Sequence, residues 1–189
     1  QREWFARMIS GKAMLAEKLA LFWHGHFATS NVKLREPLLL WRQYRLFRTL
    51  GAGRFEDLVL AVAKDPAMIR WLDQNANRKG SPNENFAREL MELFTLGIGH
   101  YGEADVKGAA RAFTGWSARG SEVRFDAAFH DDGIKSVLGR EGPLGGEDVV
   151  RHLCGLPACA ELISGKLWRF FAGPGPDARS APPGTAAAG

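Results

Sequence analysis

The segment that most constrains the fold is residues 72–97, which read LDQNANRKGSPNENFARELMELFTLG. A polar loop leads into Ser81, Pro82 and Glu84, which supply a helix cap, a first-turn proline and the glutamate of a capping box. Gly97 follows the last apolar turn, and glycine accepts the left-handed conformation of a helix end at little cost. We therefore expect a helix that begins near Ser81 and ends at Gly97.

Similar signals predict further helices on both sides of this segment. Ser10 is expected to cap a helix that ends near Phe27, and Pro37 fits the first turn of a helix that Gly51 stops with a left-handed cap. Helical patterns also cover residues 55–63, 65–72, 104–113 and 147–171, whereas residues 122–130 read as a short extended or hairpin segment. The expected fold is mainly α, an irregular multi-helix bundle with a helix-loop-helix at its centre.

The composition is that of one ordinary globular domain. The chain has 189 residues, of which 46% are hydrophobic and 24% charged, enough to bury a single core. Residues 1–172 are predicted to form one helical domain. From residue 173 the sequence GPGPDARSAPPGTAAAG carries four of the nine prolines and no large apolar side chain, so residues 173–189 are predicted to be a disordered tail or linker.

Several function classes lack their sequence signals. No apolar run approaches the roughly 18 residues that a bilayer span requires. Lys and Arg are scattered among Asp and Glu despite a net charge of +4, so there is no strong nucleic-acid signal. Nucleophile elbows, phosphate-binding loops, dinucleotide glycine patterns and the HExxH zinc motif are missing. We also expect no signal peptide within these residues.

The polar loop has the oxygen spacing of a helix-loop-helix calcium site. Counting Asp73 as position one places Asn75 and Asn77 at positions three and five, the Lys79 carbonyl at seven and Glu84 at twelve. The capping box places Glu84 in the first turn of the exiting helix independently of this count. The loop is therefore a candidate calcium site.

Position six argues against calcium, because the sharp turn there requires glycine and the chain has Arg78. Without a metal, the loop's Asp and Asn side chains would instead form turns to nearby backbone. Both interpretations stay open, and calcium would bind weakly, with a dissociation constant on the order of 10⁻⁴ to 10⁻³ M.

The helix after the loop carries a second set of carboxylates. Glu89 and Glu92, spaced i and i+3, are candidate ligands for another divalent metal. Arg88 lies four residues from both Glu84 and Glu92, which predicts a charge ladder along one polar face. The buried face of this helix is expected to contain Phe86, Leu90, Leu93 and Phe94.

The histidines support a competing hypothesis, a metal-dependent enzyme. His24 and His26 are two positions apart, and on an extended turn they would aim at one ion, whereas on a regular helix they diverge by about 200°. His130 opens the loop HisAspAspGly, and His130 with Asp131 is compatible with metal ligation, base catalysis or a simple turn. The enzyme hypothesis requires these four residues to converge with Glu89 or Glu92. The alternative for each histidine is a hydrogen-bonded packing role.

The two cysteines, Cys154 and Cys159, have neither CxxC spacing nor a zinc-binding pattern. They are predicted to be two small buried side chains. A local disulfide in an oxidising compartment stays open.

Five segments occur in a characteristic order: FWHGHFATS, DPAMIRWLD, PNENFARELMELFTLG, DVKGAARAFTGW and HDDGIKSVLG. With them the chain resembles the bacterial domain-of-unknown-function eighteen-hundred family over about residues 4–171. The resemblance implies a largely helical, exported protein, periplasmic or extracellular, whose family domain is longer than this chain and whose activity is not established. We expect a binding or assembly module with an unidentified partner, such as a protein, and keep the metal-dependent enzyme as the alternative.

Overall fold

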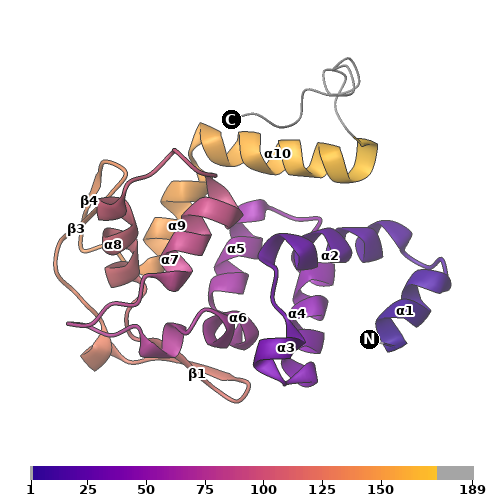
Figure 1. Cartoon of the computed structure of the whole chain (residues 1–189), viewed down its shortest axis with the longest axis horizontal. Coiled ribbons are helices and arrows are strands. Elements are labelled where there is room, and N and C mark those ends of the chain that lie inside the picture. The colour runs from indigo at the N-terminus through magenta and orange to yellow at the C-terminus, as the bar shows by residue number, and fades with distance from the viewer. Residues whose placement is uncertain (1, 174–189) are drawn as a thin grey trace, which may run out of the picture.

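The computed structural model describes residues 2–173, and Figure 1 shows a mainly α-helical protein. Residues 174–189, nearly all of the tail predicted to be disordered, lie outside the described residues. Helix α10 lies across one end of the molecule, α1 lies at the edge opposite the strands, and the other helices form an irregular bundle between them (Figure 1). The predicted fold class is confirmed.

The elements of the first half of the chain are α1 (Arg2–Ile9), α2 (Met14–Phe27), α3 (Asn31–Leu34), α4 (Pro37–Leu50), α5 (Phe55–Ala63), α6 (Pro66–Trp71), the 3-10 turn η1 (Gln74–Ala76), α7 (Asn85–Glu89) and the π-helix η2 (Leu90–Thr95). The second half contains α8 (Glu103–Ala112), β1 (Trp116–Arg119), β2 (Glu122–Phe125), the 3-10 turn η3 (Ala127–Phe129), β3 (Lys135–Val137), β4 (Arg140–Gly142), α9 (Gly146–Cys154) and α10 (Pro157–Ala172).

Two antiparallel strand pairs are the extended part of the structure. Strand β1 pairs with β2 in the register Trp116 to Phe125, and β3 pairs with β4 in the register Lys135 to Gly142. The first pair confirms the predicted hairpin, although it begins before residue 122. The second pair was not predicted from the sequence. None of the helices in the described part combines the length and apolar character of a bilayer span.

The helix predicted to begin near Ser81 begins four residues later, at Asn85. Ser81 instead exchanges backbone hydrogen bonds with Arg78, of 2.9 and 3.4 Å, around a left-handed Gly80 with φ of 84°. This tight turn holds Ser81 away from a capping position. The Asn83 side chain accepts a hydrogen bond from Asn85 N at 3.0 Å in its place.

Aromatic side chains fill the core between α2, α4 and η2. Phe27 stacks on Phe47 with ring centroids 5.6 Å apart, and Phe94 meets Phe27 edge to face at 5.1 Å. Gly51 packs so closely that a Cβ there would lie 2.6 Å from Trp23 Cδ1 and would also overlap the Phe47 carbonyl oxygen. Its φ of −64° is right-handed, so close packing, and not the predicted left-handed cap, requires glycine.

A buried polar chain crosses the same region. Thr29 Oγ1 donates a hydrogen bond to Gln43 Oε1, and Gln43 Nε2 donates to Asp65 Oδ2 at 2.7 Å. Asp65 caps α6, accepting from Met68 N at 3.1 Å. Burial raises the pKa of Asp65 to about 6, against hydrogen bonds that lower it.

Candidate functional site

The polar loop predicted to bind calcium connects distant parts of the fold. Asp73 adopts a left-handed conformation with φ of 56°, and its carboxylate pairs with Lys33 Nζ at 2.9 Å. Asn75 exchanges two hydrogen bonds with the backbone of Ala118 in β1, donating at 3.2 Å and accepting at 2.7 Å. The amide of Asn75 thus acts as an extra strand partner for β1.

Asn77 is buried and makes equally specific contacts. Its Nδ2 donates to Ala110 O at 2.9 Å, and its Oδ1 accepts from Asn83 N at 2.9 Å. Glu84 pairs with Arg88 at 2.9 Å. Each side chain counted as a calcium ligand is therefore bonded to another protein group through at least one of its oxygens.

Lys79, the predicted carbonyl ligand, is held by the neighbouring loop. Its backbone N–H donates to Phe129 O at 2.8 Å, and its Nζ pairs with Asp132 at 2.6 Å. Within residues 2–173, no group of three or more His, Cys, Asp or Glu side chains is arranged to hold a metal ion. Calcium binding stays a prediction of the spacing.

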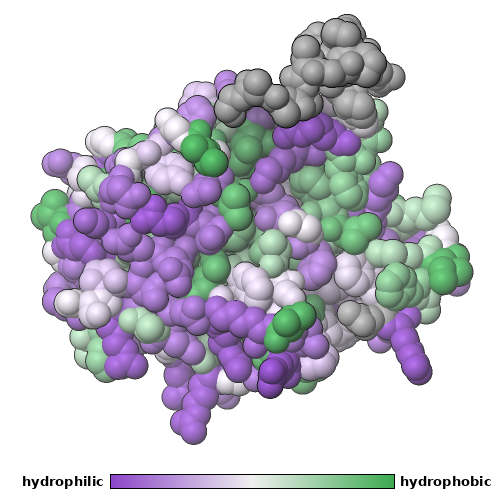
Figure 2. Space-filling view, in the orientation of Figure 1, coloured by the Kyte–Doolittle hydropathy of each residue, from purple (hydrophilic) through white to green (hydrophobic). Residues whose placement is uncertain are grey.

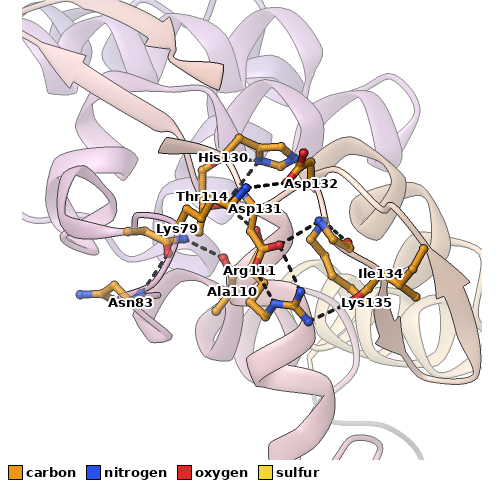
Figure 3. A network of polar contacts seen from close by, with 12 residues as sticks. Lys79, Asn83, Ala110, Arg111, Thr114, His130, Asp131, Asp132, Ile134 and Lys135 are labelled. Atoms are coloured by element: carbon orange, nitrogen blue, oxygen red, sulfur yellow. Dashed lines mark hydrogen bonds and ion pairs between the residues drawn. The ribbon is translucent and has the colours of Figure 1, made fainter. Parts of the chain in front are cut away.

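The HisAspAspGly loop is fastened to α8 by an ion pair (Figure 3). The Asp131 carboxylate accepts from Arg111 Nε at 2.6 Å and from Nη2 at 3.1 Å, and these hydrogen bonds lower the pKa of Asp131 to about 2. Lys135 lies beside them, is 1% exposed, and donates from Nζ to Gly133 O at 2.9 Å. Asp131 is thus an ionised anchor of the loop.

His130 has a packing role in this loop. Its Nδ1 lies 2.9 Å from Thr114 O, and its ring packs against Phe125 with centroids 5.2 Å apart. His26 contacts residues of α2, α5, η2 and α10 and shares none of these partners. Figure 1 shows α2 and the loop after β2 on different sides of the molecule. The convergence of His26 with His130 that the enzyme hypothesis requires is not observed.

His24 and His26 also separate, because α2 is a regular helix through both. His24 packs edge to face on Trp4 of α1, with ring centroids 5.5 Å apart. His26 is 8% exposed, and its Nε2 lies 3.1 Å from Phe94 O. The two imidazoles therefore cannot serve one ion.

The predicted charge ladder along the next helix forms only in part. Arg88 pairs with Glu84 as expected, but its other hydrogen bonds, of 2.7 and 2.9 Å, go to Glu103 of α8 and not to Glu92. The reason is the π-helix η2, in which each turn takes roughly one residue more than in an α-helix. Residues after Leu90 are consequently rotated about the helix axis, relative to their positions in a regular α-helix.

The same rotation turns Glu92 towards Tyr101 and Leu93 towards solvent. Glu92 accepts a hydrogen bond from the Tyr101 hydroxyl at 2.9 Å. Burial, and then the neighbouring charge of Glu92, raise the pKa of Glu89. Leu93, expected in the buried face, is 42% exposed.

The end of the π-helix leaves backbone carbonyls that other helices satisfy. Lys166 Nζ of α10 donates to Leu93 O at 2.8 Å, and His26 Nε2 faces Phe94 O. Because a carbonyl only accepts, His26 Nε2 carries the proton and its Nδ1 is an acceptor. Lys166 Nζ, 3.3 Å from Nδ1, donates to it.

This cluster belongs to an open groove of about 520 Å³ between α2, η2 and α10. The groove is lined by Leu21, Phe22, Gly25, His26, Ala28, Leu93, Lys166, Arg169 and Phe170. Figure 2 shows apolar surface between the C-terminal part of α10 and α2. Sequence reasoning missed Lys166, since nothing local connects it with a histidine 140 positions away.

The groove is cationic as well as apolar. Burial, followed by the charge of Lys166, lowers the pKa of His26 to about 3, so the imidazole is neutral at ordinary pH. Burial and the neighbouring Arg169 lower the pKa of Lys166. No carboxylate is among the lining residues, so the groove can attract an anion without repelling it.

Comparison with known proteins gives one match. The family model described as "Protein of unknown function (DUF1800)" matches residues 1–185 of the 189 residues. No curated protein and no solved structure matches the chain.

Proposed function

We propose that this chain, which belongs to the DUF1800 family of proteins of unknown function, is a binding module for an anionic amphiphile. The ligand has a carboxylate head and an unbranched apolar chain, and it lies in the groove between α2, η2 and α10. The proposal rests on the Lys166 ammonium group, which lies in an apolar groove and donates only two of its three N–H groups to the described residues.

Lys166 supplies the contact for the carboxylate head. An ammonium group has three N–H donors, and the structure uses two of them, on Leu93 O and His26 Nδ1. The third has no acceptor among residues 2–173. A carboxylate oxygen would complete the set with a charge-assisted hydrogen bond, and Arg169 adds a second positive charge nearby.

The walls of the groove suit an apolar chain. Leu21 and Leu93 are each 42% exposed and Phe170 is 37% exposed, although all three are large apolar side chains. Covering such surface contributes about 25 cal/mol per Å². A cationic amphiphile would face two like charges, and a neutral one would form no ion pair with Lys166 or Arg169.

Binding of this kind fits the exported location that the family resemblance implies, and export itself stays a prediction. It also fits the expectation of a binding module more closely than that of a metal-dependent enzyme, because the predicted catalytic histidines lie apart.

Calorimetric titration with dodecanoate and dodecanol, below their micelle-forming concentrations, tests the proposal. Dodecanoate is expected to bind the parent protein more tightly than dodecanol. Lys166→Met keeps the length and helix preference of the side chain but removes its charge, and is expected to weaken dodecanoate binding about tenfold or more. Dodecanol binding is expected to change much less, because the dodecanol hydroxyl forms no ion pair with Lys166.

Lys107→Met is the matched control, because Lys107 is an exposed lysine on α8, away from the groove. Circular dichroism melting of both variants separates a loss of affinity from a loss of fold. Equal affinity of the parent for dodecanoate and dodecanol, or equal weakening by the two variants, would overturn the proposal.

A further inference from the structure

A second recess lies on the side of α2 that His24 faces, and its chemistry is aromatic and uncharged. It has a volume of about 240 Å³. Its lining residues are Trp4, His24, Asn31, Pro37, Leu40, Trp41 and Tyr44. None of them lines the groove beside Lys166.

Three aromatic rings form one continuous wall of this recess. Tyr44 touches Trp4 and Trp41, with ring centroids 5.0 and 4.9 Å apart and interplanar angles of 42° and 31°. The rings thus contact each other side by side and do not form two parallel faces with a slot between them. Such a wall suits a ligand ring that packs through one face only.

Polar groups without partners occur in the same recess. The indole Nε1 of Trp4 is buried and has no acceptor among the described residues. Burial lowers the pKa of His24, which favours the neutral imidazole, and neither ring nitrogen has a hydrogen-bond partner among the described residues. A buried donor without an acceptor is uncommon in native proteins and marks a place where a ligand or water completes the structure.

Two ion pairs lie beside the recess. Arg7 bonds Glu3 at 2.9 Å, and its guanidinium lies 5.9 Å from the centroid of Trp41. Glu17 accepts from Arg48 Nε at 2.7 Å and from the Tyr44 hydroxyl. No Lys, Arg, Asp or Glu side chain lines the recess, so it offers a charged ligand no counter-charge.

We infer that this recess binds one ring of a neutral saccharide. A sugar ring has an apolar C–H face to lie on the wall of Trp4, Tyr44 and Trp41, and hydroxyl groups around its edge. Those hydroxyls can exchange hydrogen bonds with His24, and one can accept from Trp4 Nε1 once the indole moves enough to expose this buried donor. A hydrocarbon ring would leave both polar groups unpaired, and a flat heteroaromatic ring would stack through only one of its two faces here.

The inference goes beyond the proposed function and rests on separate residues. Its test is the ¹⁵N–¹H spectrum of the tryptophan indoles of the full chain, with Trp4→Phe assigning the Trp4 signal. The probes are cellotriose, maltotriose and triacetylchitotriose. At least one is expected to shift the Trp4 signal saturably, and Trp41→Ala is expected to weaken that binding about tenfold.

Trp168→Ala is the matched control, because Trp168 is 55% exposed on α10 and lines neither cavity. It is expected to leave sugar binding unchanged. His24→Phe keeps the ring that packs on Trp4 but removes its hydrogen-bonding nitrogens, and it too is expected to weaken binding. The inference is overturned if none of the three sugars shifts the parent signal saturably, or if Trp41→Ala and His24→Phe both bind like the parent.

Discussion

His24 and His26 lie two positions apart on α2 and face two different recesses. His24 packs on Trp4 with ring centroids 5.5 Å apart, whereas His26 Nδ1 lies 3.3 Å from Lys166 Nζ. An α-helix turns about 100° per residue, so alternate positions point to nearly opposite sides. Helix α2 thereby separates an uncharged aromatic recess from a cationic apolar groove, and burial keeps both imidazoles neutral.

The first prediction concerns the pH dependence caused by His26. Burial lowers its pKa from 6.5 to about 3 in the folded protein, so between these values the unfolded chain binds a proton that the fold does not. The stability that this site contributes is present above pH 6.5 and is lost as the pH falls towards about 3. The slope contributed is at most about 1.4 kcal/mol per pH unit.

Urea unfolding at several pH values measures this slope. His26→Gln cannot titrate, and its amide can still donate to Phe94 O, so its stability should fall less on acidification than that of the parent. An identical pH profile for both proteins would contradict the assignment of His26 as a buried neutral group.

Asp65 should make the stability depend on pH in the opposite direction to His26. Burial raises its pKa from 3.8 to about 6, so the folded state binds the extra proton and stability decreases as the pH rises through this interval. Asp65→Asn keeps an acceptor for Gln43 and for the α6 cap. It should remove the decrease, which denaturant titrations at about pH 4 and about pH 7 would measure. A parent-like decrease in Asp65→Asn would show that another group is responsible.

Gly25→Ala should stabilise the protein by about 0.5 to 1 kcal/mol. Gly25 lies inside α2 with an ordinary helical φ, and a Cβ there would meet no atom within 4 Å. Alanine therefore restricts the unfolded chain without a clash. Gly25→Leu should keep the stability but occupy the groove, and so weaken dodecanoate binding. Thermal melting and calorimetry measure the two effects, and unchanged binding by Gly25→Leu would argue against the groove as the site.

Gly51→Ala should destabilise by about 1 to 3 kcal/mol, because the new methyl group would overlap the Trp23 indole and the Phe47 carbonyl. Gly53→Ala, whose Cβ would approach Leu50 O at 3.2 Å, is the nearby comparison and should be milder. Chemical denaturation gives both values. Equal effects would mean that the close approach at Gly51 is not what requires glycine.

The calcium prediction for the polar loop has its own test. If the spacing marks a real site, calorimetry should detect weak calcium binding that is lost in both Asp73→Ala and Glu84→Ala. Lys33→Ala should strengthen it, because Lys33 pairs with the Asp73 carboxylate. Absence of heat, together with no calcium-dependent rise in melting temperature, would end the prediction.

The correct helix predictions rest on signals that act within one helical turn, namely first-turn prolines, capping side chains and helix-ending glycines. Pro37 and Asp65 begin or cap helices where expected, and Gly97 has the positive φ of 86° that a helix end favours. The side-chain caps predicted at Ser10 and Ser81 are wrong. Helix α2 begins at Met14 without a side-chain cap, and Ser81 forms a tight turn with Arg78 instead. A helix cap and a tight turn compete at Ser81, and contacts of the loop with β1, α8 and η3 favour the turn.

The residues of the candidate sites were predicted less well than the helices. The sequence spacing identified His24 and His26 as candidate site residues but did not predict the surroundings of either side chain. It did not identify Lys166, Trp4 or Trp41 as site residues. The π-helix was equally hidden, since Leu90–Thr95 has the apolar spacing of an ordinary helix. That one irregular turn moves Leu93 outwards and Glu92 away from Arg88.

The sequence by itself determined the mainly helical fold and the starts of helices such as α4 and α6, because prolines and capping side chains act on backbone within one turn. Only the tertiary structure decided the chemistry around α2. The bond between Lys166 and the carbonyl of Leu93 joins positions 73 apart, and it exists because the end of a π-helix leaves a carbonyl that must find a donor from another helix.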